Sequence, residues 1–322
     1  MPAPIRPLHL AVALGRRDAR VQEAESCVRA ARLAEHGRFD FVTLGDASGP
    51  PAEGRGRPDA LAVLARIAPA TRRVGLVPAL TATTRTGPFP LARAVAGLDR
   101  ASRGRAGWVV EPPLPTAGAR ASGRRAAPAE EEAWREADAV ADAVARLWDG
   151  HDRDRPHRAG PSAGPRSPQG RPVTVVDATA PAARATAARH ADVVLLRAER
   201  AHDPAVFRAR SDDLREAARA HGPGAGGRRP LVLASVPVDL HTAADAVGLA
   251  DQVHHWYATG AADGFHFRPG NPDRDLPLLA DGTAAVLQHR GLLRRFYPGA
   301  TLREHLELPR PATGRAPARG TA

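Results

Sequence analysis

Polar side chains stand where most of the apolar runs of this 322-residue chain end. The hydroxyls of Thr81, Thr83 and Thr179 follow two of these runs, and the carboxylate of Asp46 follows another. Hydroxyls and single charges at such places suit hydrogen bonding to a small molecule. For Asp46 a second interpretation stays open, because a carboxylate there also caps a helix or organises a loop. The full set is Asp46, Ser48, Thr81, Thr83, Thr84, Glu111, Asp177, Thr179, Arg197, Glu199, Asp239, His241 and Arg268.

Metal and nucleophile chemistry find little support in the sequence. The histidines and aspartates of segment 151–157 match no zinc spacing, and we expect no metal site. His254 and His255 are adjacent in a predicted helix, so they point about 100° apart and cannot share a metal. Cys27 lies in the middle of a predicted helix, where a small buried side chain is expected. The sequence assigns no catalytic residue, since it contains no nucleophile elbow, Walker motif or HExxH.

Eight short apolar runs, each followed by a helical pattern, must position these polar residues. The runs are rich in Val and Leu with little polar alternation, which is typical of parallel strands buried on both faces. Eight consecutive strand–helix pairs predict a (β/α)₈ TIM barrel, an α/β fold whose sites lie at the carboxyl ends of the strands. The alternative is a doubly wound open sheet, but the first turn, LGRRDAR, lacks its GxGxxG signature. The predicted strands are 8–14, 39–46, 73–81, 104–112, 171–179, 191–198, 229–240 and 263–270, and the helices 21–36, 58–70, 90–102, 130–149, 180–190, 203–221, 243–260 and 276–291.

One barrel domain over residues 1–308 and a disordered tail over 309–322 are expected from this pattern. Segments 112–129 and 150–170 are rich in Pro, Gly and Arg and interrupt the alternation. They are predicted to be flexible loops rather than linkers between domains, because the strand–helix pattern resumes after each of them.

The net charge of +11 arises from 46 arginines, with no lysine, against 35 acidic residues. The arginines are spread along the chain among Asp and Glu, so we expect a basic, solvated surface and no nucleic-acid partner. A single cysteine excludes a disulfide framework. No apolar stretch reaches 18 residues, so neither a membrane span nor a membrane partner is expected, and the predicted location is the cytoplasm.

Several segments together resemble the bacterial luciferase-like flavin monooxygenases, most closely the FMN-dependent two-component subgroup that includes nitrilotriacetate monooxygenases. The core of the resemblance is RVGLVPALTATTRTGPF followed by ARAVAGLDRASRGRAGW, residues 73–89 and 92–108. Each piece is weak alone, but the set in this order is specific and spans most of residues 8–311. The further matching segments are FDFVTLGD, VARLWD, PRSPQGRPV, ARHADVV, GAADGFHFRPG and TLREHLELPRP.

The resemblance implies a TIM barrel and a monooxygenase that uses O₂ and reduced FMN, supplied by a separate flavin reductase, on a small organic substrate. Its other expected partner is a second copy of the chain, as a homo-oligomer. Carried over residue by residue, it implies cofactor-binding roles for Asp46, Thr81 or Thr83, and Thr179.

The chain departs from the family at the loop that holds the phosphate. Its glycines are replaced by Ala178 and Ala183, and Asp177 adds a negative charge. We therefore expect weak binding of FMN. The alternative function is a catalytically inactive luciferase-like barrel that acts as a partner or binding subunit.

Overall fold

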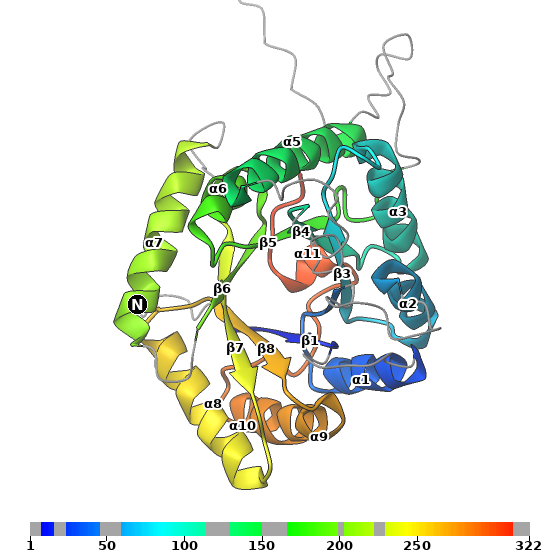
Figure 1. Ribbon diagram of the computed structural model, residues 1–322. Helices are drawn as coiled ribbons and strands as arrows, with labels where there is room; N and C mark the ends of the chain where they lie inside the picture. The colour runs from blue at the N-terminus through cyan, green and yellow to red at the C-terminus, as the bar shows by residue number, and fades with distance from the viewer. Residues whose placement is uncertain are drawn as a thin grey trace, which may run out of the picture.

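Eight parallel strands form a closed barrel in a computed structural model that describes residues 8–15, 24–45, 59–113, 129–149, 166–198, 203–221 and 229–311. Each strand pairs with the next along the chain, and β8 closes the barrel by pairing with β1. Figure 1 shows the helices as an outer ring around these strands. The predicted (β/α)₈ barrel is confirmed, and the open-sheet alternative is wrong because the sheet has no free edge.

The elements follow the predicted order. The strands are β1 (His9–Ala13), β2 (Phe41–Gly45), β3 (Gly75–Thr81), β4 (Gly107–Glu111), β5 (Val173–Asp177), β6 (Val193–Arg197), β7 (Leu231–Val238) and β8 (Gly264–Pro269). The helices are α1 (Ala24–His36), α2 (Ala60–Ile67), α3 (Pro88–Ala101), α5 (Glu130–Asp149), α6 (Arg184–His190), α7 (Pro204–Ala220), α8 (Ala243–Ala258), α9 (Pro272–Pro277), α10 (Ala285–His289) and α11 (Leu302–His305). Short 3₁₀ turns, η1 (Ala68–Ala70) and η2 (Pro181–Ala183), and a π-helical segment, η3 (Leu278–Ala284), complete them.

The side chains of each strand divide between two apolar cores. Inward-facing residues such as Val77, Val175 and Leu233 fill the barrel, while outward-facing ones such as Val110 and Val176 pack under the helices. Trp108 of β4 joins the outer core and meets Trp148 of α5 edge to face at 6.2 Å. This double burial explains why the strands are continuous apolar runs.

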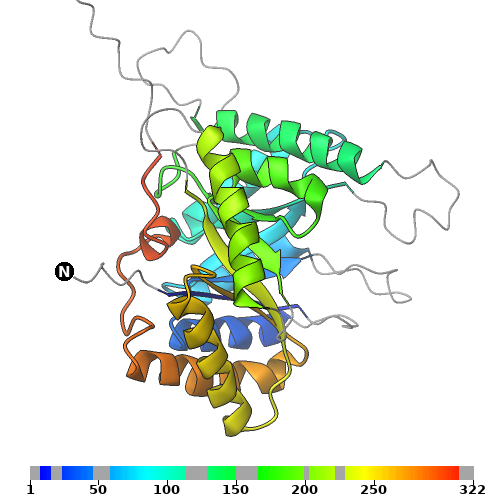
Figure 2. The same ribbon diagram turned by 90° about the vertical axis from the view of Figure 1, so that its left-hand side faces the viewer.

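Helix α11 closes the amino-terminal end of the barrel. Leu302 and Leu306 belong to the inner core, and the Leu302 amide donates to the carbonyl of Gly104, just before β4. A Cβ at Gly75, the first residue of β3, would lie 2.6 Å from Leu302, so only glycine leaves room for the helix there. Figure 2 shows α11, in red, at one end of the barrel, so in the described part of the chain this helix covers the end opposite the carboxyl ends of the strands.

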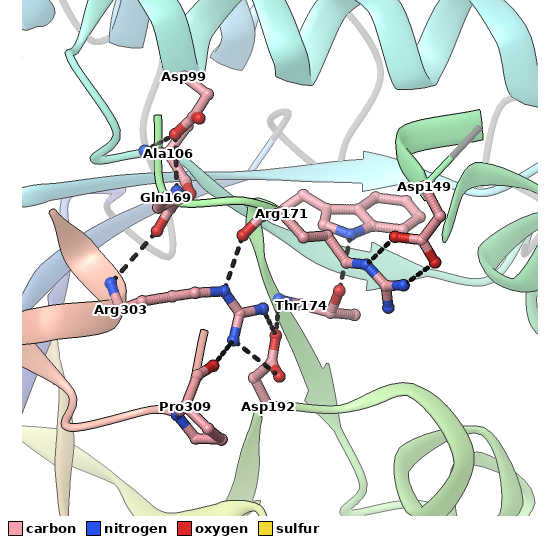
Figure 3. Close-up of polar contacts among 10 residues, drawn as sticks. Asp99, Ala106, Asp149, Gln169, Arg171, Thr174, Asp192, Arg303 and Pro309 are labelled. Carbon is pink, nitrogen blue, oxygen red and sulfur yellow. Dashed lines mark hydrogen bonds and ion pairs between the residues drawn. The ribbon is translucent and has the colours of Figure 1, made fainter. Parts of the chain in front are cut away.

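A polar network anchors α11 to the strands (Figure 3). The guanidinium of Arg303 donates to Asp192 at 2.7 Å and to the Arg171 carbonyl at 2.8 Å. The Arg303 amide donates to Gln169, whose own amide group donates to Asp99 at 2.6 Å. Because these groups are buried or half-buried and mutually paired, the network fixes the position of α11, the plug helix of the barrel, rather than adding a reactive group.

A second buried cluster lies beside the start of β2. Asp40 is fully buried, accepts a hydrogen bond from the Leu10 amide at 2.8 Å, forms an ion pair with Arg294 and has a carboxylate oxygen 3.3 Å from Nδ1 of His9. Burial alone would raise the pKa of Asp40, but the charges and hydrogen bonds of Arg294 and His9 outweigh it and lower the pKa to about 2. Nearby His305 is buried, and that burial lowers its pKa to about 4.

The last helix differs from the prediction of one helix over 276–291. It begins earlier, at Pro272, because the buried carboxylate of Asp275 accepts from the Asn271 amide at 2.9 Å and ties the helix start to the Leu240 amide. It then widens into η3, where Thr283 donates to the carbonyl of Ala246 in α8. The local sequence could not indicate this widening, since it follows the contact with α8.

Parts of the predicted organisation fall outside the described residues. Most of the two predicted loops, 114–128 and 150–165, and the end of the predicted tail, 312–322, are not described. The division into a barrel and a tail and the flexibility of the loops therefore stay predictions. Among the helices that are described, none is both long and apolar enough to span a bilayer.

Acid should destabilise the fold over a defined range of pH. The unfolded chain binds a proton at His305 near pH 6.5, whereas the folded chain resists protonation until about pH 4. As far as His305 is concerned, the free energy of unfolding should be level between pH 7 and 8 and fall as the pH drops from 6.5 to 4, by an upper bound of roughly 3 kcal/mol. Urea unfolding across this range measures it.

The variant His305→Gln serves as the control for this acid dependence. It should unfold more easily at neutral pH but show a shallower decline between pH 6.5 and 4. An unchanged slope in the variant would contradict the assignment to His305.

Candidate active site at the carboxyl ends of the strands

The open end of the barrel carries a ring of polar side chains. Thr81 and Glu111 are paired in register at the ends of β3 and β4, and Asp177 and Arg197 end β5 and β6. Each lies two residues after an inward-facing apolar residue, so each faces the barrel axis. A Cβ added at Gly45 would lie 3.9 Å from the Glu111 carboxylate, which places that carboxylate over the barrel mouth.

Asp177, Thr179 and Arg197 form one connected corner of this ring. One carboxylate oxygen of Asp177 accepts from the Thr179 amide at 3.0 Å, and the other is 3.3 Å from Nε of Arg197. The Arg197 amide donates to the Thr179 hydroxyl at 2.8 Å. The predicted residue Thr179 is thus at the mouth, but its hydroxyl oxygen and its amide both have partners within the chain.

His266 of β8 lies one layer below this ring. Its two ring nitrogens are 2.9 Å from the Thr43 hydroxyl and 3.0 Å from the Ser235 hydroxyl, and all three residues are buried. Burial and then the nearby guanidinium of Arg268 lower the pKa of His266 to about 4. A neutral imidazole accepts at one nitrogen and donates at the other, so one hydroxyl donates to the ring and the other accepts from it.

Thr83 does not join this group. Its hydroxyl donates to the carboxylate of Glu136 in α5 at 3.0 Å, and the amide and hydroxyl of Thr84 donate to the same oxygen. These bonds tie the turn after β3 to the outer helix. Thr81, in contrast, is exposed at the mouth beside Glu111.

Of the remaining site residues expected from the sequence, some lie outside the described residues and others lie away from the ring. Asp46 lies outside the described residues. Asp239 and His241 are exposed and interact with Arg274 of α9, away from the inward-facing ring. Cys27 is buried in α1, and that burial raises the pKa of its thiol to about 11, which keeps it an unreactive thiol. The described residues hold no group of three His, Cys, Asp or Glu side chains arranged for a metal ion.

Sequence reasoning missed the trio of Thr43, Ser235 and His266. A signal existed, because His266 precedes the strand-end residue Arg268 by two positions and therefore faces the same side of the strand. Its two hydroxyl partners lie on other strands, 223 and 31 residues away in sequence. Local pattern alone could not name them.

His266 should stay neutral throughout the physiological range, because its burial among hydroxyls disfavours the imidazolium form. We expect the ¹⁵N resonances of its ring to stay constant between pH 8 and 5.5. Nuclear magnetic resonance of histidine-labelled protein measures this, with His266→Asn to assign the signals. An inflection near pH 6.5 in these resonances would be inconsistent with the buried, hydroxyl-bonded ring.

Comparison with proteins of known structure and sequence agrees with this architecture. Nitrilotriacetate monooxygenase component A of Aminobacter aminovorans is 24% identical over an alignment that covers 87% of this chain and 89% of that protein. EDTA monooxygenase from Chelativorans sp. BNC1 superposes with a TM-score of 0.79 at 21% identity and covers 96% of this chain and 100% of its own. A riboflavin lyase, solved with modified FMN and riboflavin, superposes with a TM-score of 0.71 at 20% identity, over 94% and 96% of the two chains.

The sequence model of the luciferase-like monooxygenases matches residues 8–309. That span runs from the first strand of the barrel through the plug helix α11 and includes every residue of the polar ring. The expected kinship with two-component monooxygenases such as the nitrilotriacetate enzyme is confirmed. The chain belongs to the luciferase-like monooxygenase family.

Proposed function

We propose that this protein is a flavin-dependent monooxygenase that oxidises a small organic substrate at the carboxyl ends of its strands. The observation that carries the proposal is the match to the monooxygenase family over residues 8–309, in a chain whose barrel carries a polar ring at the carboxyl ends of its strands. Reduced flavin and O₂ are the proposed co-reactants. A flavin supplies the oxidising chemistry when bound, and the protein supplies orientation and exclusion of water.

The flavin is proposed to arrive already reduced, from a separate reductase. The proposal rests on the similarity to a protein described as component A of a monooxygenase, which by that description works with another component. A flavin that is delivered and released needs only moderate affinity. We also propose that the chain associates with a second copy of itself. The proposed substrate is a small organic molecule, and no described contact selects a particular one.

Thr81 is the residue proposed to meet the ligand most directly. It is exposed at the mouth, it faces inward and it lies beside the Glu111 carboxylate. The Thr179 hydroxyl accepts from the Arg197 amide and keeps its own proton to donate to a ligand. Thr83 is the weaker of the two candidates from the strand-3 turn, because Glu136 already holds its hydroxyl. The role expected for Asp46 stays a prediction.

The phosphate of FMN does not fit the loop after β5. The amides of Ala178, Thr179 and Ala183 already donate within the chain, and Pro181 has none to offer. We therefore assign no role to the phosphate in positioning the ligand. This same observation favours the second candidate function, a barrel without catalysis that serves as a partner subunit.

Flavin binding separates the two candidate functions. We expect reduced flavin, added under anaerobic conditions, to bind the purified protein. Thr81→Val should weaken binding by about three- to tenfold, the loss of one neutral hydrogen bond. Fluorescence and absorbance titrations measure this.

A matched control for Thr81→Val is Ser26→Ala, which removes a hydroxyl from α1 on the outside of the barrel. It should leave flavin binding unchanged. If the wild-type protein binds neither FMN nor riboflavin, oxidised or reduced, the monooxygenase proposal fails and the non-catalytic barrel is favoured.

A further inference from the structure

Two backbone amides of the loop that follows β5 already donate within the chain. Ala178 donates to the Leu195 carbonyl at 2.9 Å, and Ala183 donates to the Ala180 carbonyl at 3.1 Å. Position 181 is proline and has no N–H. The helix that follows, α6, is seven residues long and has no side-chain cap. A phosphate binds such a loop through several amides that point at it, and here the amides of Ala178 and Ala183 have partners already.

Asp177 takes two further donors of this corner. Its carboxylate accepts from the Thr179 amide at 3.0 Å with one oxygen and lies 3.3 Å from Nε of Arg197 with the other. An amide and a guanidinium are the two donors that an incoming anion would use at this place. The carboxylate therefore occupies the position of an anion from within the chain.

The neighbouring charges do not reverse this effect. The other described charged groups of the ring are Glu111 and Arg268, one of each sign, and His266 below them is neutral near pH 7. Asp177 pairs with Arg197, and the exposed Arg184 follows the loop as the first residue of α6. The Asp177 carboxylate would repel a dianionic phosphate placed here, whereas a neutral hydroxyl could donate to that carboxylate.

We infer that Asp177 makes this site select a flavin without a terminal phosphate, so that the protein binds riboflavin in preference to FMN. The inference rests on the proposed function and names the flavin that it uses. The two flavins differ only in the 5′-phosphate, and the 5′-hydroxyl of riboflavin suits a carboxylate acceptor. The preference for riboflavin depends on the charge of Asp177. Salt should reduce it, because the Asp177–Arg197 pair is partly exposed.

The test is a titration of riboflavin and of FMN into the wild type and into Asp177→Asn. The asparagine keeps a carbonyl acceptor for the Thr179 amide but removes the negative charge and releases Arg197. Wild type should bind riboflavin at least about tenfold more tightly than FMN, a difference of about 1.4 kcal/mol. In Asp177→Asn this ratio should fall at least about fivefold, through tighter binding of FMN. Fluorescence quenching at two salt concentrations gives the constants.

The matched control is Asp251→Asn, which removes the carboxylate of Asp251 in α8, where it accepts from Arg290, the residue after α10, at 2.6 Å. Its net charge changes as in Asp177→Asn, but its ratio of the two affinities should equal that of the wild type. Thermal unfolding of both variants checks that they are folded.

The outcomes separate this inference from the function on which it rests. FMN binding as tightly as riboflavin in the wild type, or equal tightening of both flavins in Asp177→Asn, would overturn the selection by Asp177 and leave the proposed function standing. Absence of binding by either flavin would overturn the proposed function, and the inference with it.

Discussion

Closure of the parallel barrel is the constraint on which the other features of this protein depend. Because β8 pairs with β1, every strand is hydrogen-bonded on both sides and apolar side chains must cover both of its faces. The inner face is too narrow for a pore and is filled by valines, leucines and Phe41. Helix α11 then seals the amino-terminal end. In the described structure, this leaves the carboxyl ends of the strands as the place where a ligand could bind.

Buried charge follows the same division. At the plug end, Arg303 with Asp192 and Arg294 with Asp40 are ion pairs with additional hydrogen bonds, so their function is to hold α11 and the segment before it. A buried pair of this kind specifies position more than it adds stability, because desolvation offsets much of the attraction. At the mouth, charges are more exposed and paired more loosely, as at Asp177 and Arg197. Groups in that state can exchange an internal partner for a ligand.

The corner after β5 illustrates how a side chain can take over the role of a ligand. Asp177 accepts from the Thr179 amide and pairs with Arg197, so two donors of this corner already have an anionic partner within the chain. The small residues at 178 and 183 are buried and leave the loop compact. A barrel of the luciferase-like family with such a corner differs from one that takes a phosphate through backbone donors. Below it, the neutral His266 and its two hydroxyl partners keep the lower layer of the mouth polar and uncharged.

The sequence by itself determined the elements, their order and the end of the barrel that carries polar residues. Those features depend on periodicity and apolar runs, which are local properties, and α5 was predicted to the residue because its apolar stripe and its bounds are both local. The same local pattern placed Thr81, Glu111, Asp177 and Arg197 at strand ends.

Only the tertiary structure decided which of these residues meet. The register of closure brought His266 between hydroxyls of two other strands and directed Thr83 to Glu136 of an outer helix. It also set the widened turn in η3 against α8. Such pairings join residues tens to hundreds of positions apart, and their partners are chosen by how strands and helices pack, which no local sequence pattern encodes.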